Sequence, residues 1–160
     1  DEKVTVKING QPTEYILQNG YAVLGRTWKK GDVVEVNLPM QVRQVVANEN
    51  LTDDNGKTAL QRGPLMYCAE WPDNNGKVSN IILPLNTNFE TEFKPDLLNG
   101  VTVLKSEVPA VIIDSNGSSI STVKQPFVAI PYYAWAHRGK GEMMIWFPAK
   151  VKDIDLFTTN

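Results

Sequence analysis

The dipeptide Asn-Gly occurs six times in this chain of 160 residues, and it constrains the fold more than any other feature. Both residues tolerate a positive φ, so the pair favours two-residue turns whose twist matches that of paired antiparallel strands. The six pairs are Asn9-Gly10, Asn19-Gly20, Asn55-Gly56, Asn75-Gly76, Asn99-Gly100 and Asn116-Gly117. Their spacing predicts many short antiparallel strands joined by tight turns.

The segments between these turns alternate apolar and polar residues. Val34, Val36 and Leu38 share one face of an extended chain, which indicates a half-buried strand. Similar strands are expected at residues 21–27, 65–70, 101–105, 127–135 and 142–147. No window shows a helical stripe, and the best helical candidate is a single turn near residues 95–98. The fold class expected is therefore all-β, an antiparallel and jelly-roll-like β-sandwich.

A polar, turn-rich stretch at residues 73–80 is the candidate boundary within this fold. It predicts the strands of a partial first sandwich over residues 1–72, followed by a C-terminal β-sandwich over residues 73–160. A single continuous domain is the alternative, because 160 residues is about the length of one domain.

Charge and composition exclude several classes of partner. The chain has 16 Lys and Arg against 18 Asp and Glu, a net charge of −2, and no run of like charges, so neither nucleic acid nor an anionic membrane surface is expected as a partner. Its longest apolar runs fall far short of the roughly 18 residues that span a bilayer. Cys68 is the only cysteine, which excludes an internal disulfide and a multi-thiolate metal site built from this chain alone.

Candidate catalytic groups are weak. Glu70 and Asp73 flank Trp71, but an exposed rim explains them as well as a glycosidase carboxylate pair does. His137 is the only histidine and has no nucleophile motif near it, and Cys68 is expected to be a small buried hydrophobe. The Asp-rich turns at 53–56 and 73–76 are explained as tight turns without calcium. No catalytic residue, metal or other cofactor is therefore expected in this chain.

The aromatic residues are a stronger signal, because an indole face can stack on a sugar ring or anchor a protein interface. Three aromatic residues, a histidine and an arginine fall within residues 131–138, on one expected strand and the loop after it. The candidates for contacting a carbohydrate or a neighbouring domain are Tyr133, Trp135, His137, Arg138, Trp71 and Arg62. We prefer core packing plus domain docking to a sugar site as the explanation of these aromatic residues. Arg26, Arg62 and Arg138 are expected to bind carboxylates at a domain junction.

Three stretches resemble a known family. They are NGYAVLGRTWKKGD at 19–32 with VEVNLPM at 34–40, ALQRGPLMYCAE at 59–70, and IPYYAWAHRG at 130–139 with residues 143–148. In order and spacing they are similar to the region that follows the catalytic barrel in glycoside hydrolase family 127, the β-L-arabinofuranosidase family. Together they span most of the chain from Val4 to Pro148.

This resemblance implies an enzyme in which a six-fold helical barrel precedes β-sandwich domains and which removes β-L-arabinofuranose from arabinose-containing glycans. The family's chemistry is attributed to a cysteine nucleophile, held by zinc with other cysteines and a glutamate in that barrel. No position of this chain inherits those roles, so zinc is expected only in the catalytic domain.

The leading hypothesis is an accessory region that packs on the catalytic barrel of its own full-length protein. The family places further strands before the segment that starts at Val4, so an exposed sheet edge is expected here, and with it a homodimer. A glycan is the remaining expected partner. The alternative function is a carbohydrate-binding module, which requires two coplanar exposed rings beside polar donors; a free-standing enzyme would need a carboxylate pair in a cleft.

Overall fold

The structure is a computed structural model and describes residues 3–116 and 119–154. Within these ranges it contains antiparallel β-strands and short 3-10 helices, and no α-helix. The expected all-β antiparallel sandwich class is confirmed. The chain divides into two compact units, Asp1–Gln41 and Val42–Asn160, which we call the N-terminal and C-terminal units.

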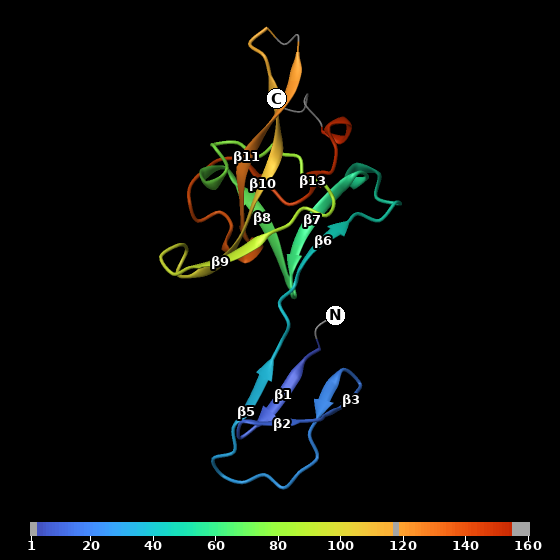
Figure 1. The fold of residues 1–160 in the computed structure, drawn as a ribbon, viewed down its shortest axis with the longest axis vertical. Helices are drawn as coiled ribbons and strands as arrows, with labels where there is room; N and C mark the ends of the chain where they lie inside the picture. The colour runs from blue at the N-terminus through green and yellow to red at the C-terminus, as the bar shows by residue number, and fades with distance from the viewer. Residues whose placement is uncertain (1–2, 117–118, 155–160) are drawn as a thin grey trace. The chain divides into compact units, whose positions relative to one another are not determined.

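The N-terminal unit holds a three-stranded sheet and a separate hairpin (Figure 1). The sheet has the order β2 (Gln11–Thr13), β1 (Thr5–Ile8), β5 (Val34–Asn37), and the hairpin pairs β3 (Ile16–Gln18) with β4 (Tyr21–Val23). The turn between β1 and β2 has φ values of 52° at Asn9 and 78° at Gly10, and the β3–β4 turn has 51° and 83° at its own Asn-Gly pair. Both are the hairpins that the dipeptide predicts.

The apolar face of β5 is open to solvent. Val36 pairs with Val6 and Val34 with Ile8 across the sheet, so the four side chains share one face. Val6 and Ile8 are buried, but Val34, Val36 and Leu38 are 42%, 56% and 60% exposed. The expectation of a half-buried strand here is wrong, because all four residues of β5 are exposed.

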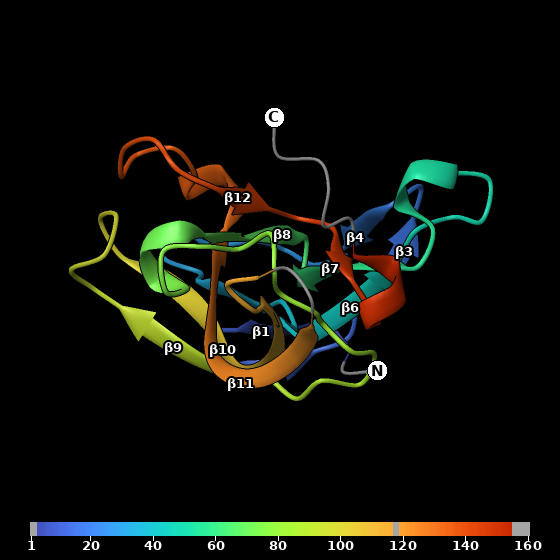
Figure 2. The same ribbon diagram turned by 90° about the horizontal axis from the view of Figure 1, so that it is seen from above.

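The C-terminal unit is built on one eight-stranded antiparallel sheet. Its main path is β13-β7-β8-β11-β10-β9, with β6 paired to β7 and β12 paired to β8. The bounds are β6 (Val42–Val46), β7 (Lys57–Arg62), β8 (Leu65–Glu70), β9 (Glu90–Lys94), β10 (Val101–Ile113), β11 (Ile120–Pro131), β12 (Met143–Met144) and β13 (Phe147–Pro148). Figure 2 shows β10 and β11 curving together as a long pair. The 3-10 helices are η1 (Thr52–Asp54), η2 (Trp71–Asp73), η3 (Tyr132–Ala134) and η4 (Val151–Asp153).

The core of this unit joins strands from both sides of residue 72. Leu60 on β7 and Tyr67 on β8 pack in one buried cluster with Leu104 on β10 and Phe127 on β11. Phe127 also meets Phe147 of β13 edge-to-face, with ring centroids 5.5 Å apart. Since these strands share one sheet and one core, the division of the chain falls after Gln41 and not in the polar stretch at residues 73–80.

Three local expectations fail in the C-terminal unit. The strand expected over 142–147 is divided into β12, which pairs with β8, and β13, which pairs with β7. The strand expected over 127–135 ends at Pro131, and residues 132–134 form η3 instead. The turn near 95–98 is not helical, because Leu98 and Asn99 have φ values of 51° and 64° and lead directly into β10. Gly117, in the last Asn-Gly pair, lies outside the described residues. The described residues include no helix long and apolar enough to cross a membrane.

Candidate functional site

Residues 132–135, which we call the aromatic segment, project from the end of β11. The pairing of β11 with β8 stops at Pro131, opposite Tyr67, and the Trp135 N–H then donates to the Tyr132 carbonyl at 3.1 Å. Ala134 is buried and anchors the turn, whereas Tyr132, Tyr133 and Trp135 are 42%, 65% and 40% exposed. The fold thus presents three large rings to solvent on a short, hydrogen-bonded turn.

A buried carboxylate holds the chain that follows the aromatic segment. Glu70 is 3% exposed, and its Oε1 accepts the Ala136 N–H at 3.2 Å. Its Oε2 accepts Arg138 Nε at 3.0 Å and Nη2 at 2.6 Å, and the same Nη2 lies 2.6 Å from Asp73 Oδ2. Ala136 has φ 72°, a strained value for a residue other than glycine, so these contacts stabilise an otherwise unfavourable turn. The exposed-rim interpretation of Glu70 is wrong.

The charges in this cluster are satisfied by one another. Burial alone would lower the pKa of Arg138, but hydrogen bonds to Asp73 and Glu70 outweigh it and raise that pKa above its usual value. A partly buried arginine held by two carboxylates stays charged and orients its neighbours. The arrangement fixes a loop, and it does not free a carboxylate for acid–base chemistry.

Trp71 lies beside this cluster, on η2. Its backbone N–H donates to the Glu142 backbone carbonyl at 3.0 Å, and its ring packs so closely on Gly141 that a Cβ at position 141 would overlap it. Trp71 is therefore half-buried against residues 141–142. These residues cover part of the ring that we expected to be a stacking face.

Sequence reasoning missed two polar side chains that support the site. The buried Asn74 side chain donates to the Glu70 carbonyl at 2.8 Å and the Val128 carbonyl at 2.9 Å, and accepts the Val128 N–H at 3.0 Å. The Glu142 carboxylate accepts N–H groups from Val78 and Ser79, both at 2.9 Å. The position of Asn74 in an Asp-Asn-Asn-Gly turn is the only local signal, since asparagine commonly bonds nearby backbone there.

The rings of the aromatic segment do not form a flat platform. Tyr132 and Trp135 are stacked, with centroids 5.8 Å apart and planes 9° from parallel, so each covers part of a face of the other. Tyr133 is the most exposed of the three. His137 is exposed too, and makes no hydrogen bond or ion pair with any other described residue. Of the sequence candidates, Tyr133, Trp135, His137 and Arg138 thus share one segment.

Arg62 lies on β7, beside the strand that carries Tyr67. Tyr67 pairs with Leu60 on β7 and with Pro131 on β11, so it lies between Arg62 and the start of the aromatic segment. The Tyr67 hydroxyl donates to the Thr102 carbonyl at 2.9 Å. Burial raises the pKa of Tyr67, and the charge of the nearby Arg62 guanidinium and its hydrogen bond to the Tyr67 hydroxyl partly oppose the increase.

The Cys68 thiol is poorly suited to act as a nucleophile. Burial and the charge of Glu70 raise the pKa of the Cys68 thiol to about 12, which keeps it protonated at neutral pH. The expected role of Cys68 as a small buried residue is confirmed. Within the described ranges, no three His, Cys, Asp or Glu side chains are grouped to hold a metal ion. In the two Asp-rich turns, Asp54 pairs with Lys57 and Asp73 with Arg138.

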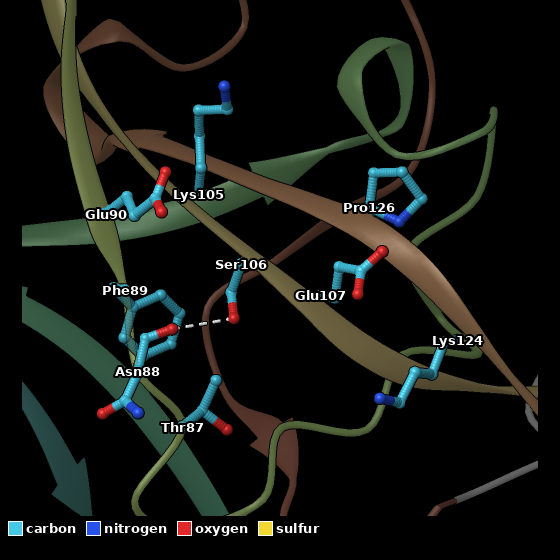
Figure 3. A pocket seen from close by; sticks show the side chains of 9 residues that line it. All are labelled: Thr87, Asn88, Phe89, Glu90, Lys105, Ser106, Glu107, Lys124 and Pro126. Carbon is cyan, nitrogen blue, oxygen red and sulfur yellow. Dashed lines mark hydrogen bonds between the residues drawn. The ribbon is translucent and has the colours of Figure 1, made fainter.

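A separate polar hollow of about 680 Å³ lies on the curled part of the sheet (Figure 3). It is lined by the 87–89 loop together with side chains of β9, β10 and β11, among them Glu90, Glu107 and Lys124. The Ser106 hydroxyl donates to the Asn88 carbonyl at 2.8 Å across one side. Sequence reasoning missed this hollow, because its lining comes from four segments whose proximity depends on the sheet register.

Comparison with known proteins identifies both units. Residues 42–148 match the model of the glycoside hydrolase family 127 C-terminal domain, and residues 1–40 match that of the β-L-arabinofuranosidase, GH127 middle domain. A non-reducing end β-L-arabinofuranosidase of Bifidobacterium longum is 32% identical over 157 residues, covering 89% of this chain and 23% of that protein.

Solved structures agree. A GH127 β-arabinofuranosidase has a TM-score of 0.88 and 42% identity, covering 96% of this chain and 24% of its own. A GH127 β-L-arabinofuranosidase from Geobacillus stearothermophilus T6 has a TM-score of 0.80 and 38% identity, covering 92% and 24%. This chain spans about a quarter of the length of these relatives. It belongs to glycoside hydrolase family 127, and it matches the middle and C-terminal domains of that family.

Proposed function

We propose that this chain is the non-catalytic accessory β-sandwich region of a glycoside hydrolase that acts on arabinofuranose-containing glycans, and that it packs on the catalytic helical barrel of that parent enzyme. The names of its relatives support the substrate class, since they are β-L-arabinofuranosidases about four times as long. Zinc and catalysis belong to the part of the parent outside these 160 residues.

The observation that carries this proposal is the rigid exposure of the aromatic segment. Tyr132, Tyr133 and Trp135 stand in solvent, yet the buried Glu70–Arg138 pair fixes the loop that follows them. Energetically important interface residues are typically rigid aromatic rings and arginines, because they bury much area at little cost in conformational entropy. A pre-formed aromatic surface of this kind fits a protein partner.

The chemistry of the described residues supports a non-catalytic role. Burial raises the pKa of the Cys68 thiol to about 12, and the Glu70 and Asp73 carboxylates both pair with the single guanidinium of Arg138. The catalytic pair of a glycosidase needs one free carboxylate and one acid facing each other across the substrate. Glu70 and Asp73 do not meet that requirement.

A second copy is the further partner that we propose, through the N-terminal unit. β5 is an edge strand, and its exposed Val34 and Val36 give it an apolar face. Open edges with apolar faces pair readily with other strands, and a self-complementary edge closes as a dimer.

Glycan binding by this chain is the second candidate function. The exposed ring of Tyr133 offers one stacking face, and the polar hollow of Figure 3 offers carboxylate, amine and hydroxyl groups suited to sugar hydroxyls. The parallel stack of Tyr132 on Trp135 counts against a two-ring platform, so we rank this function below domain docking.

The test compares the full-length parent with this chain, using a chromogenic β-L-arabinofuranoside and added zinc. We expect hydrolysis by the parent and none by the 160 residues; turnover by the 160 residues would overturn the non-catalytic assignment. In the parent, Tyr133→Ser and Trp135→Ser should lower thermal stability more than they do in the isolated chain, because the rings lose a partner only where the barrel is present. Phe93→Ser is the matched control, since Phe93 is an aromatic side chain of similar exposure, 64%, on a different strand, β9.

A further inference from the structure

The turn at Asn19-Gly20 joins the two strands of an isolated hairpin. Among the described residues, strands β3 and β4 pair only with each other, so they form a two-stranded sheet of their own. Both turn residues are exposed, and a Cβ added at Gly20 would meet no atom within 4 Å. A two-stranded hairpin is marginally stable by itself in water, so this turn opens at a lower cost in free energy than a turn within a larger sheet.

An asparagine followed by glycine can react with its own backbone. The glycine nitrogen loses its proton to water and attacks the side-chain carbonyl carbon, which closes a succinimide ring and releases the side-chain nitrogen as ammonia. A water molecule then opens the ring to give aspartate or isoaspartate. Glycine favours the first step because it has no Cβ to hinder the approach. The reaction therefore needs a side-chain amide that is free to turn and a glycine N–H that is free of hydrogen bonds.

Asn19-Gly20 meets both requirements. Within the described ranges, the Asn19 side chain makes no hydrogen bond, and neither does the Gly20 N–H. Asn19 has φ 51° and Gly20 φ 83°, the left-handed values of a tight two-residue turn. Gln18 and Asn19 are polar, so burial of this tip under another part of the protein is not favoured. Among the described residues, only the hairpin itself restrains the amide.

The turn at Asn9-Gly10 is a matched case in which the amide is held. Its φ values, 52° and 78°, are close to those of Asn19-Gly20, and it also joins paired neighbouring strands, β1 and β2. Here, however, Asn9 Nδ2 donates to Asp32 Oδ1 at 2.9 Å, and Asn9 Oδ1 accepts the Val33 N–H at 2.9 Å. Two hydrogen bonds must therefore break before the Asn9 side chain can turn to the Gly10 nitrogen.

The three remaining pairs within the described residues are held at the glycine. The Gly76 N–H donates to the Trp71 carbonyl and the Gly100 N–H to the Leu97 carbonyl, both at 2.9 Å, so these two nitrogens are not free to attack. The Gly56 carbonyl accepts a backbone N–H at 2.9 Å, which fixes that peptide unit to a later segment of the chain.

We propose that Asn19 is a site of spontaneous deamidation in the folded protein, with water as the co-reactant, and that Asn9 is protected. Isoaspartate at position 19 lengthens the main chain by one methylene group and places a carboxylate at the hairpin tip. A two-residue turn requires particular φ and ψ values at both of its residues, so the longer backbone disrupts the pairing of β3 with β4. The modification thus limits the lifetime of the native hairpin.

The test is an ageing experiment on the wild-type full-length parent in heavy-oxygen water at pH 8, followed by proteolysis in ordinary water and mass spectrometry. Ring opening during ageing adds one heavy oxygen atom, which separates it from deamidation during the work-up. We expect Asn19 to deamidate at least about tenfold faster than Asn9, because the Asn9 amide must first break two hydrogen bonds. In guanidinium chloride the two sites should react at similar rates. Equal rates in the folded protein, or the same ratio in denaturant, would overturn the inference.

Two variants test the cause and the consequence. Asp32→Ala removes one of the two bonds to the Asn9 amide, so it should speed deamidation at Asn9 and leave the rate at Asn19 unchanged. Asn19→Gly keeps a residue suited to positive φ and lacks the amide, so hydrogen exchange over residues 16–23 should rise during ageing in the wild type only. An unchanged rate at Asn9, or an equal rise in Asn19→Gly, would contradict the inference. The wild-type ratio decides it even where Asp32→Ala does not fold.

Discussion

Replacing Arg138 by methionine should destabilise the C-terminal unit by about 3 kcal/mol at pH 7. Removing one member of a buried ion pair leaves the charge of the other uncompensated, which typically costs about 3–5 kcal/mol. The Glu70 side chain is 4% exposed and that of Arg138 is 16% exposed, so the carboxylate has little access to water. We choose the lower end of the range because the Ala136 N–H still donates to Glu70, and because Asp73, 22% exposed, can turn to solvent.

The assay is urea unfolding followed by tryptophan fluorescence, comparing wild type, Arg138→Met, Glu70→Gln and the double variant. With a slope of about 1–3 kcal/mol per molar urea, a loss of about 3 kcal/mol lowers the midpoint by roughly 1–3 M. The double variant should lose less than the sum of the single losses, since each single change strands a partner that the double change removes. A loss well under 1 kcal/mol for Arg138→Met, or strict additivity, would refute the view that this pair fixes the loop after the aromatic segment.

Three further outcomes are expected. Gly141→Ala should displace the Trp71 ring and destabilise the unit by about 1–3 kcal/mol, visible as a lower thermal midpoint with altered fluorescence, and an unchanged midpoint would contradict the close packing. For Glu142, burial favours the neutral form, but hydrogen bonds from residues 78–79 outweigh this effect and lower the pKa of the carboxyl. The stability that this carboxylate contributes is therefore full above pH 4.5, its unperturbed pKa, and is lost as the pH falls further. Glu142→Gln should make the free energy of unfolding depend less on pH below that value. Cys68 should resist iodoacetamide at pH 8 in the folded chain and react after unfolding, and rapid native alkylation would contradict its burial and raised pKa.

Local chemistry made part of the fold predictable. The pairs Asn9-Gly10 and Asn19-Gly20 form the expected hairpins, because their positive φ values depend on the two residues alone. Three matched stretches were enough to recognise the family, whose C-terminal and middle domain models cover residues 42–148 and 1–40. The burial of Cys68 also followed from its apolar strand.

Other expectations failed where a distant partner decides the outcome. Alternation in β5 could not show that its apolar face stays open, since that depends on what covers the sheet edge. The strand expected through Trp135 stops at Pro131, whose partner on β8 is Tyr67, and the chain then turns into η3.

The candidate residues were named from the sequence, but their roles were decided by tertiary structure. Sequence alone determined an all-β chain with Asn-Gly hairpins, one buried thiol and an aromatic, arginine-containing segment. Only the folded chain brings Arg138 to Glu70, 68 positions away, and leaves Arg62 without a carboxylate. The physical reason is that turn conformation is set by neighbours along the chain, whereas the pairing of a buried charge is set by sheet register and desolvation, which residues distant in sequence create together.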